Sequence, residues 1–148
     1  MHVLRAEKGF IIAGQDSDGT VTPADLGLSW AVSKSKDFIG KRSMSRPDSV
    51  REDRKQLVGL LTENPADVLP EGAQIVDTVT SAPPMKMIGH VTSSYYSANL
   101  GHSIALALIK GGRQRGGERI FVPLEDRTIS ATITAPRFYD PEGEKMNA

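Results

Sequence analysis

Hydrophobic and polar residues alternate in short runs along the second half of the chain, with Gly, Pro and Asp between the runs. Alternation with a period of two is typical of strands that bury one face of a sheet. We therefore expect strands over residues 57–61, 73–77, 87–92, 103–109, 119–124 and 128–135. Short strands at close spacing predict a mainly β fold, built as a small antiparallel barrel or sandwich.

The segments between these runs have the composition of turns and loops. Residues 70–72 read Pro-Glu-Gly, which suits a tight turn because the proline ring presets φ. Polar residues at 93–99 predict a loop, and the glycine-rich stretch 111–117 predicts a flexible connection between two strands. The run at 103–109 is apolar on both faces, so we expect that strand to be covered on both sides.

The first third of the chain has a weaker pattern, from which we also expect strands. Residues 9–14 form an apolar run bounded by glycines and predict a buried strand. Arg5 and Glu7 would share one face of a preceding strand, and residues 28–32 predict a further strand centred on Trp30. Without the rest of its sheet, this piece would expose apolar strand edges, from which we expect either a homodimer of the isolated chain or disorder of this piece.

Two short helices are expected among these strands. Thr22 can cap a helix in which Pro23 takes the first position and Asp25 lies three residues after the cap. Asp37 is expected to cap the second helix. Residues 43–55 are polar and charged and read as a connector, so we place a domain boundary between residues 52 and 53.

Composition narrows the class of protein. The chain of 148 residues is 39% hydrophobic and 24% charged, which is typical of a globular domain. Its formal net charge of zero gives no electrostatic reason to expect nucleic acid or a membrane as a partner. The chain contains no cysteine, which excludes disulfides and thiolate chemistry and fits a cytoplasmic protein. It enters a patterned segment at Val3 without a leader, and we interpret this start as that of a piece of a longer protein.

Candidate chemistry is sparse. Asp16 and Asp18 hint at a calcium loop, but the further oxygen ligands are missing and a turn is the better interpretation. The histidines lack metal-ligand spacing and are expected to be structural: His2, His90 and His102. No nucleophile elbow or phosphate-binding loop is present. We therefore predict no catalytic residue and no metal site in this chain.

Arg5 and Trp30 stand slightly above this background. An arginine fork near an aromatic ring can bind a planar ligand that carries a carboxylate. The alternative is a surface pair between Arg5 and Glu7, with Trp30 as a core residue. The residues alone leave both interpretations open.

An ordered set of motifs resembles the back half of the glycine-cleavage T-protein (aminomethyltransferase) family. The matching segments are residues 4–9, 14–16, 22–32, 36–41, 55–60, 89–93 and 100–106. This resemblance implies a jelly-roll or Greek-key-like antiparallel barrel over residues 53–148. It also implies that residues 1–52 are an α+β segment, the tail of the middle, folate-binding subdomain.

Within this family, the first motifs look most like those of the alpha subunits of bacterial heterotetrameric sarcosine oxidases. Lys8 and Ala13 stand where a plain T-protein usually has Ala and Tyr. This branch implies a parent enzyme that oxidises sarcosine with a flavin (FAD or FMN) and NAD, both bound outside this chain. Its partners would be the upstream part of the same subunit and the other subunits.

The resemblance also implies a tetrahydrofolate pocket between subdomains, where the one-carbon unit is captured as 5,10-methylenetetrahydrofolate. The arginine that matches Arg5 lies close to the pterin in this family, and we expect Trp30 and Tyr95 to line the wall. The alternatives are a piece of a T-protein, a piece of a dimethylglycine dehydrogenase-type relative, or a β-barrel interaction module without catalytic activity.

Overall fold

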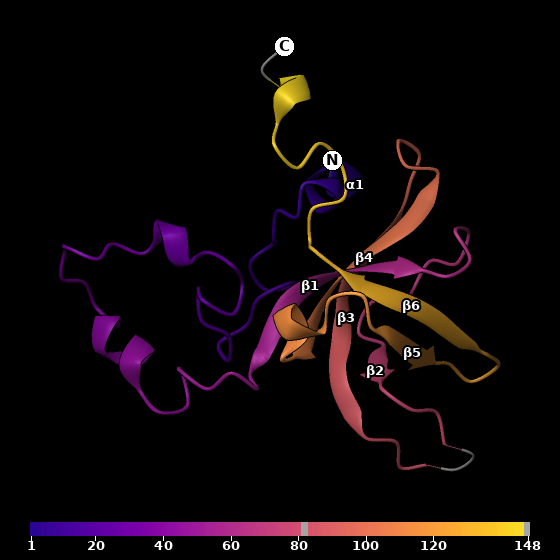
Figure 1. Cartoon of the computed structure of the whole chain (residues 1–148), viewed down its shortest axis with the longest axis horizontal. Coiled ribbons are helices and arrows are strands. Elements are labelled where there is room, and N and C mark those ends of the chain that lie inside the picture. The colour runs from indigo at the N-terminus through magenta and orange to yellow at the C-terminus, as the bar shows by residue number, and fades with distance from the viewer. Residues whose placement is uncertain (81–82, 147–148) are drawn as a thin grey trace.

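A computed structural model describes residues 1–80 and 83–146 and shows a six-stranded barrel with a long irregular N-terminal segment beside it (Figure 1). The strands are β1 (Lys55–Thr62), β2 (Gln74–Val76), β3 (Met87–Ser97), β4 (His102–Lys110), β5 (Arg119–Pro123) and β6 (Thr128–Thr134). The helices are α1 (His2–Glu7) and four short 3-10 turns, η1 (Ser29–Ala31), η2 (Lys41–Ser45), η3 (Gly112–Arg115) and η4 (Glu144–Met146).

The barrel closes in the order β1-β4-β3-β2-β5-β6, and every pairing is antiparallel. Strands β2, β3 and β4 follow one another around the barrel, and β1 lies beside β4, which is a Greek-key arrangement. The prediction of a mainly β, Greek-key-like barrel is therefore confirmed, and the sandwich alternative is wrong. Closure leaves no free sheet edge among these strands.

The core follows from the alternation within each strand. Ala105, Ala107 and Ile109 of β4 point into the barrel interior, where they join fully buried residues from the other strands. Leu106 and Leu108 point outward but are also buried, because the N-terminal segment packs over them. The outer cluster is completed by Leu57, Ile11, Val21, Leu26 and Phe138. The prediction that residues 103–109 are covered on both faces is thus confirmed.

The prediction of strands in the first third of the chain is wrong. Arg5 and Glu7 lie on α1 and not on a strand. Residues 9–14 make only an isolated bridge, because Gly9 and Gly14 have positive φ values of 72° and 90° and turn the chain at both ends. The segment 28–32 contains the 3-10 turn η1 (Ser29–Ala31) and not a strand, and Trp30 is 80% exposed, so the core interpretation of Trp30 is also wrong.

The expected capping box is present, although it stabilises one turn and no helix. Both the backbone N–H and the hydroxyl of Thr22 donate to Asp25 Oδ2, at 2.8 and 2.9 Å, and Asp25 N–H donates back to Thr22 Oγ1. Arg54 Nε donates to the same carboxylate oxygen at 3.0 Å, which ties this turn to the start of β1. Asp37 caps nothing, because the N-cap of η2 is Gly40.

β3 continues to Ser97, so the prediction of a loop at 93–99 is wrong for most of that segment. Ser93, Ser94 and Ser97 are buried, and their hydroxyls have hydrogen-bond partners there. Buried serines can stand in a strand here because these partners satisfy the hydrogen-bonding capacity of their hydroxyls. Among the residues that the structure describes, no helix has the length and apolar character that a membrane crossing requires.

Candidate functional site

Arg5 and Tyr95, two of the three residues predicted to bind folate, lie together where α1 packs on β3. Arg5 Nη2 donates to Tyr95 Oη at 3.2 Å and to Ser93 Oγ at 2.6 Å. The guanidinium carbon also lies 5.6 Å from the centre of the Tyr95 ring. The His2 ring stacks on the Tyr95 ring, with the two ring centroids 6.4 Å apart.

A buried carboxylate completes this cluster. Arg5 Nη1 forms an ion pair with Asp16 Oδ2 and donates to the carbonyl oxygen of Phe10 at 3.1 Å. Asp16 is fully buried and also accepts hydrogen bonds from the hydroxyls of Thr92 and Ser93. Both Nη atoms of Arg5 are therefore occupied within the chain, and Arg5 Nε is a buried donor without a partner.

Asp16 is ionised because its donors outweigh its burial. Burial alone would raise the pKa of this carboxyl group. Hydrogen bonds from Ser93 and Thr92, from the backbone N–H of Ile12 and from Arg5 lower the pKa below the ordinary value of 3.8. The sequence pattern indicated only a turn at Asp16 and gave no sign of this role. Its separation of 76 and 77 residues from Thr92 and Ser93 left no local signal.

Glu7 is a second buried carboxylate on α1. Its side chain is 2% exposed and accepts hydrogen bonds from Ser97 Oγ and from Asn99 Nδ2, the latter at 3.0 Å. The expected alternative of an Arg5–Glu7 surface pair is therefore wrong, since each side chain bonds to β3 or the turn that follows it. Within the described residues, no group of three or more His, Cys, Asp or Glu side chains is arranged to hold a metal ion.

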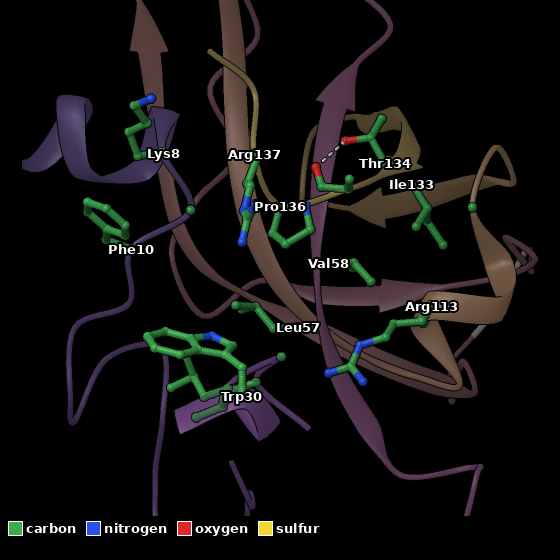
Figure 2. A pocket seen from close by; sticks show the side chains of 17 residues that line it. Lys8, Phe10, Trp30, Leu57, Val58, Arg113, Ile133, Thr134, Pro136 and Arg137 are labelled. Carbon is green, nitrogen blue, oxygen red and sulfur yellow. Dashed lines mark hydrogen bonds between the residues drawn. The ribbon is translucent and has the colours of Figure 1, made fainter. Parts of the chain in front are cut away.

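Trp30, the third predicted residue, lines a separate cavity of about 550 Å³ between the N-terminal segment and the outside of β1 and β6 (Figure 2). Phe10 and Trp30 stand on one side of this cavity, and Leu57, Pro136 and Arg137 face them. The structure thus does not bring Trp30 into the Arg5–Tyr95 cluster. The two sites are linked through Phe10, whose carbonyl oxygen accepts a hydrogen bond from Arg5.

The cavity is apolar and positively charged. Three cationic side chains line it, namely Lys8, Arg113 and Arg137. No Asp or Glu occurs among its described lining residues. A volume of this size suits a small organic ligand. Exposed aromatic rings beside positively charged side chains favour a planar anion. Phe10, Arg113 and Arg137 carry no signal in the sequence, because only the fold brings their separate segments together.

The chain matches the family described as the glycine cleavage T-protein C-terminal barrel domain over residues 55–140. It therefore belongs to that family. Its fold resembles that of the glycine cleavage aminomethyltransferase T from Bartonella henselae, with a TM-score of 0.79 over 95% of this chain and 38% of that one. The sequence identity in that comparison is 23%, so it bears on the fold alone.

Within the family, the chain is similar over nearly its whole length to sarcosine oxidase alpha subunits. It is 52% identical to the subunit of Corynebacterium sp. strain U-96 over 99% of this chain, and 38% identical to that of Rhizobium meliloti. The aminomethyltransferase of Thermosipho melanesiensis is 32% identical over 92% of the chain. The chain spans only about 15% of the length of the sarcosine oxidase subunits.

Proposed function

We propose that this chain forms one wall of a tetrahydrofolate pocket in a sarcosine oxidase alpha subunit. The observation that carries the proposal is the cavity beside Trp30, which combines aromatic rings with cationic side chains and has no acidic residue among its described lining. A folate is planar and carries carboxylates, so its shape and charge fit this lining. The cavity of about 550 Å³ lies within the range for small-ligand sites.

The complete protein would oxidise the N-methyl group of sarcosine to an imine, with the flavin and NAD bound by other parts of it. With tetrahydrofolate in place, the methylene carbon of the imine is captured as 5,10-methylenetetrahydrofolate and glycine is released. Water in its place releases formaldehyde and glycine. This chain contributes by holding the acceptor and excluding water, which is a positioning effect. No catalytic residue is assigned to it.

Two features favour this branch over a T-protein or a dimethylglycine dehydrogenase-type relative. Identity to the sarcosine oxidase subunits reaches 52%, against 32% for an aminomethyltransferase. Lys8, which stands where a plain T-protein is expected to have Ala, forms an ion pair with Asp140 at 2.8 Å and ties α1 to the C-terminal segment.

The partners we propose are the remainder of the same polypeptide and the other subunits of the enzyme. The relatives are named as alpha subunits and are much longer than this chain. Large apolar side chains are exposed along the N-terminal segment, which suits coverage by further protein. These side chains are Leu4, Phe10, Trp30, Phe38, Ile39 and Val50. Cytoplasmic location remains a prediction.

Trp30→Ala in the complete enzyme tests the proposal. We expect sarcosine oxidation to continue at its normal rate, while a larger share of the one-carbon unit appears as formaldehyde and less as 5,10-methylenetetrahydrofolate. Tyr96→Ala is the matched control, because Tyr96 is an exposed aromatic that does not line the cavity. An unchanged product ratio in Trp30→Ala, or an equal loss of both activities, would contradict the proposal.

A further inference from the structure

The three cationic side chains of the cavity differ in the partners that they already bind within the chain. Lys8 Nζ is bound by the carboxylate and the carbonyl oxygen of Asp140. Arg113 Nη2 donates to the carbonyl oxygens of Ala24 and Asp25, the latter at 2.9 Å. Arg137 forms no hydrogen bond or ion pair with any residue that the structure describes. Its guanidinium is therefore the one of these three cations without a partner among the described residues, whereas Lys8 is paired with a carboxylate and Arg113 with two backbone carbonyls.

The backbone that carries Arg137 is fixed even though its side chain is free. The N–H groups of Phe138 and Tyr139 both donate to the carbonyl oxygen of Glu7, at 2.8 and 3.0 Å. On the other side of Arg137, the carbonyl oxygen of Pro136 lies so close to Gly9 that a Cβ there would sit 2.0 Å away. The Cα of Arg137 is therefore held on both sides, which limits where its guanidinium can reach.

The surroundings of Arg137 place apolar surfaces beside a positive charge. Figure 2 shows its side chain extending beside Pro136 toward Trp30 and Leu57, which are apolar surfaces. Arg137 is itself exposed, so a ligand can reach its guanidinium from solvent. The guanidinium fork also matches a carboxylate in a bidentate geometry.

We propose that Arg137 determines the specificity of this cavity by binding a carboxylate of the ligand while Trp30 and Phe10 contact its planar part. This assignment rests on the proposed function, and it goes further by naming the group that selects a carboxylate-bearing folate over a neutral pterin. Arg5 does not serve this purpose, because its two Nη atoms are bound by Asp16, Ser93, Tyr95 and the Phe10 carbonyl.

The test measures equilibrium binding to the complete enzyme with two probes, tetrahydrofolate and 6-methyltetrahydropterin, which has the same reduced ring system but no carboxylate. Arg137→Gln is expected to weaken tetrahydrofolate binding by roughly 10- to 100-fold, the range for a hydrogen bond to a charged group. The affinity for the neutral pterin is expected to stay the same. Arg137→Lys keeps the charge but loses the fork, and should give an intermediate loss.

Arg127→Gln is the matched control, since it removes a positive charge that pairs with Asp67 and does not line the cavity. It should leave both affinities unchanged. If Arg137→Gln weakens both probes equally, or neither, the assignment of Arg137 is wrong while the proposed function stands. If the unmodified enzyme does not bind tetrahydrofolate, the proposed function fails and the assignment of Arg137 fails with it.

Discussion

Replacement of Asp16 by Asn should release α1 and the segment that follows it from the barrel. Asp16 is fully buried and accepts hydrogen bonds from Arg5, Thr92 and Ser93 and from the backbone N–H of Ile12. Within the described part of the chain, it is the ion-pair partner of Arg5, whose side chain is 11% exposed. The change from Asp to Asn keeps the shape and removes the charge.

The size of the expected loss of stability follows from the hydrogen-bond donors and the charge that Asn leaves without a partner. The amide has one accepting atom where the carboxylate had two, so some of the donors around Asp16 lose their acceptor and the Arg5 charge loses its counter-ion. Breaking a buried ion pair by removing one partner costs about 3–5 kcal/mol. Arg5 keeps its bonds to the Phe10 carbonyl and to Tyr95, which places the loss near the lower end, about 3 kcal/mol. This corresponds to roughly a 100-fold increase in local opening.

Backbone hydrogen exchange in the complete protein measures this opening locally. The amide of Phe10, which donates to the Arg5 carbonyl at 2.8 Å, should exchange on the order of 100-fold faster in Asp16→Asn. Amides of β4 should not change, because that strand is paired on both sides. Asp18→Asn is the matched control, since Asp18 is exposed and bonds only to Thr20 among the interactions described. If the two variants exchange alike, the Arg5–Asp16 pair does not hold this segment.

Two further predictions concern the stability of the folded chain. Gly59→Ala would place a Cβ 2.4 Å from the Ala135 carbonyl oxygen, so we expect a loss of about 1–3 kcal/mol in the free energy of unfolding. Thermal unfolding measures this loss, and Gly19→Ala is the control, because nothing lies within 4 Å of a Cβ at Gly19. The lowered pKa of Asp16 also predicts a pH dependence: its stabilising contribution is present above the unfolded value of 3.8 and is lost as the pH falls through the lower folded value. The difference in free energy of unfolding between the unmodified protein and Asp16→Asn should therefore be constant near neutral pH and become smaller below pH 3.8. If this difference becomes smaller well above that pH, another group is responsible.

The barrel could be predicted because its strands carry their own pattern. Alternation along residues 103–109 specified one set of side chains for the interior and another for the outer face, and both sets are buried. The turn at 70–72 was specified by its residue types and has the expected bond from Ala73 N–H to the Pro70 carbonyl. The largest error in strand length is at β3, because the serines that extend it are polar and find their partners in distant residues.

The N-terminal segment could not be predicted because its conformation depends on contacts far away in the sequence. Arg5 bonds to residues 88 and 90 positions later, and Glu7 to residues 90 and 92 positions later. A six-residue helix has little stability of its own in water. α1 is therefore stabilised by its polar contacts with β3 and by the C-terminal segment, and a local hydrophobic pattern cannot reveal either.

The sequence also could not show which arginine of the candidate site is able to bind a ligand. Arg5 and Arg137 have the same side-chain chemistry, and the resemblance to a family drew attention to Arg5. What separates them in the structure is pairing: Arg5 meets a buried carboxylate and two hydroxyls, whereas Arg137 faces apolar walls with no partner among the described residues. A guanidinium already bound by its own chain must give up those bonds before it can bind a ligand, and a free one gives up only water. The pairing of each charge, which only the fold determines, therefore decides which arginine can recognise an anion here.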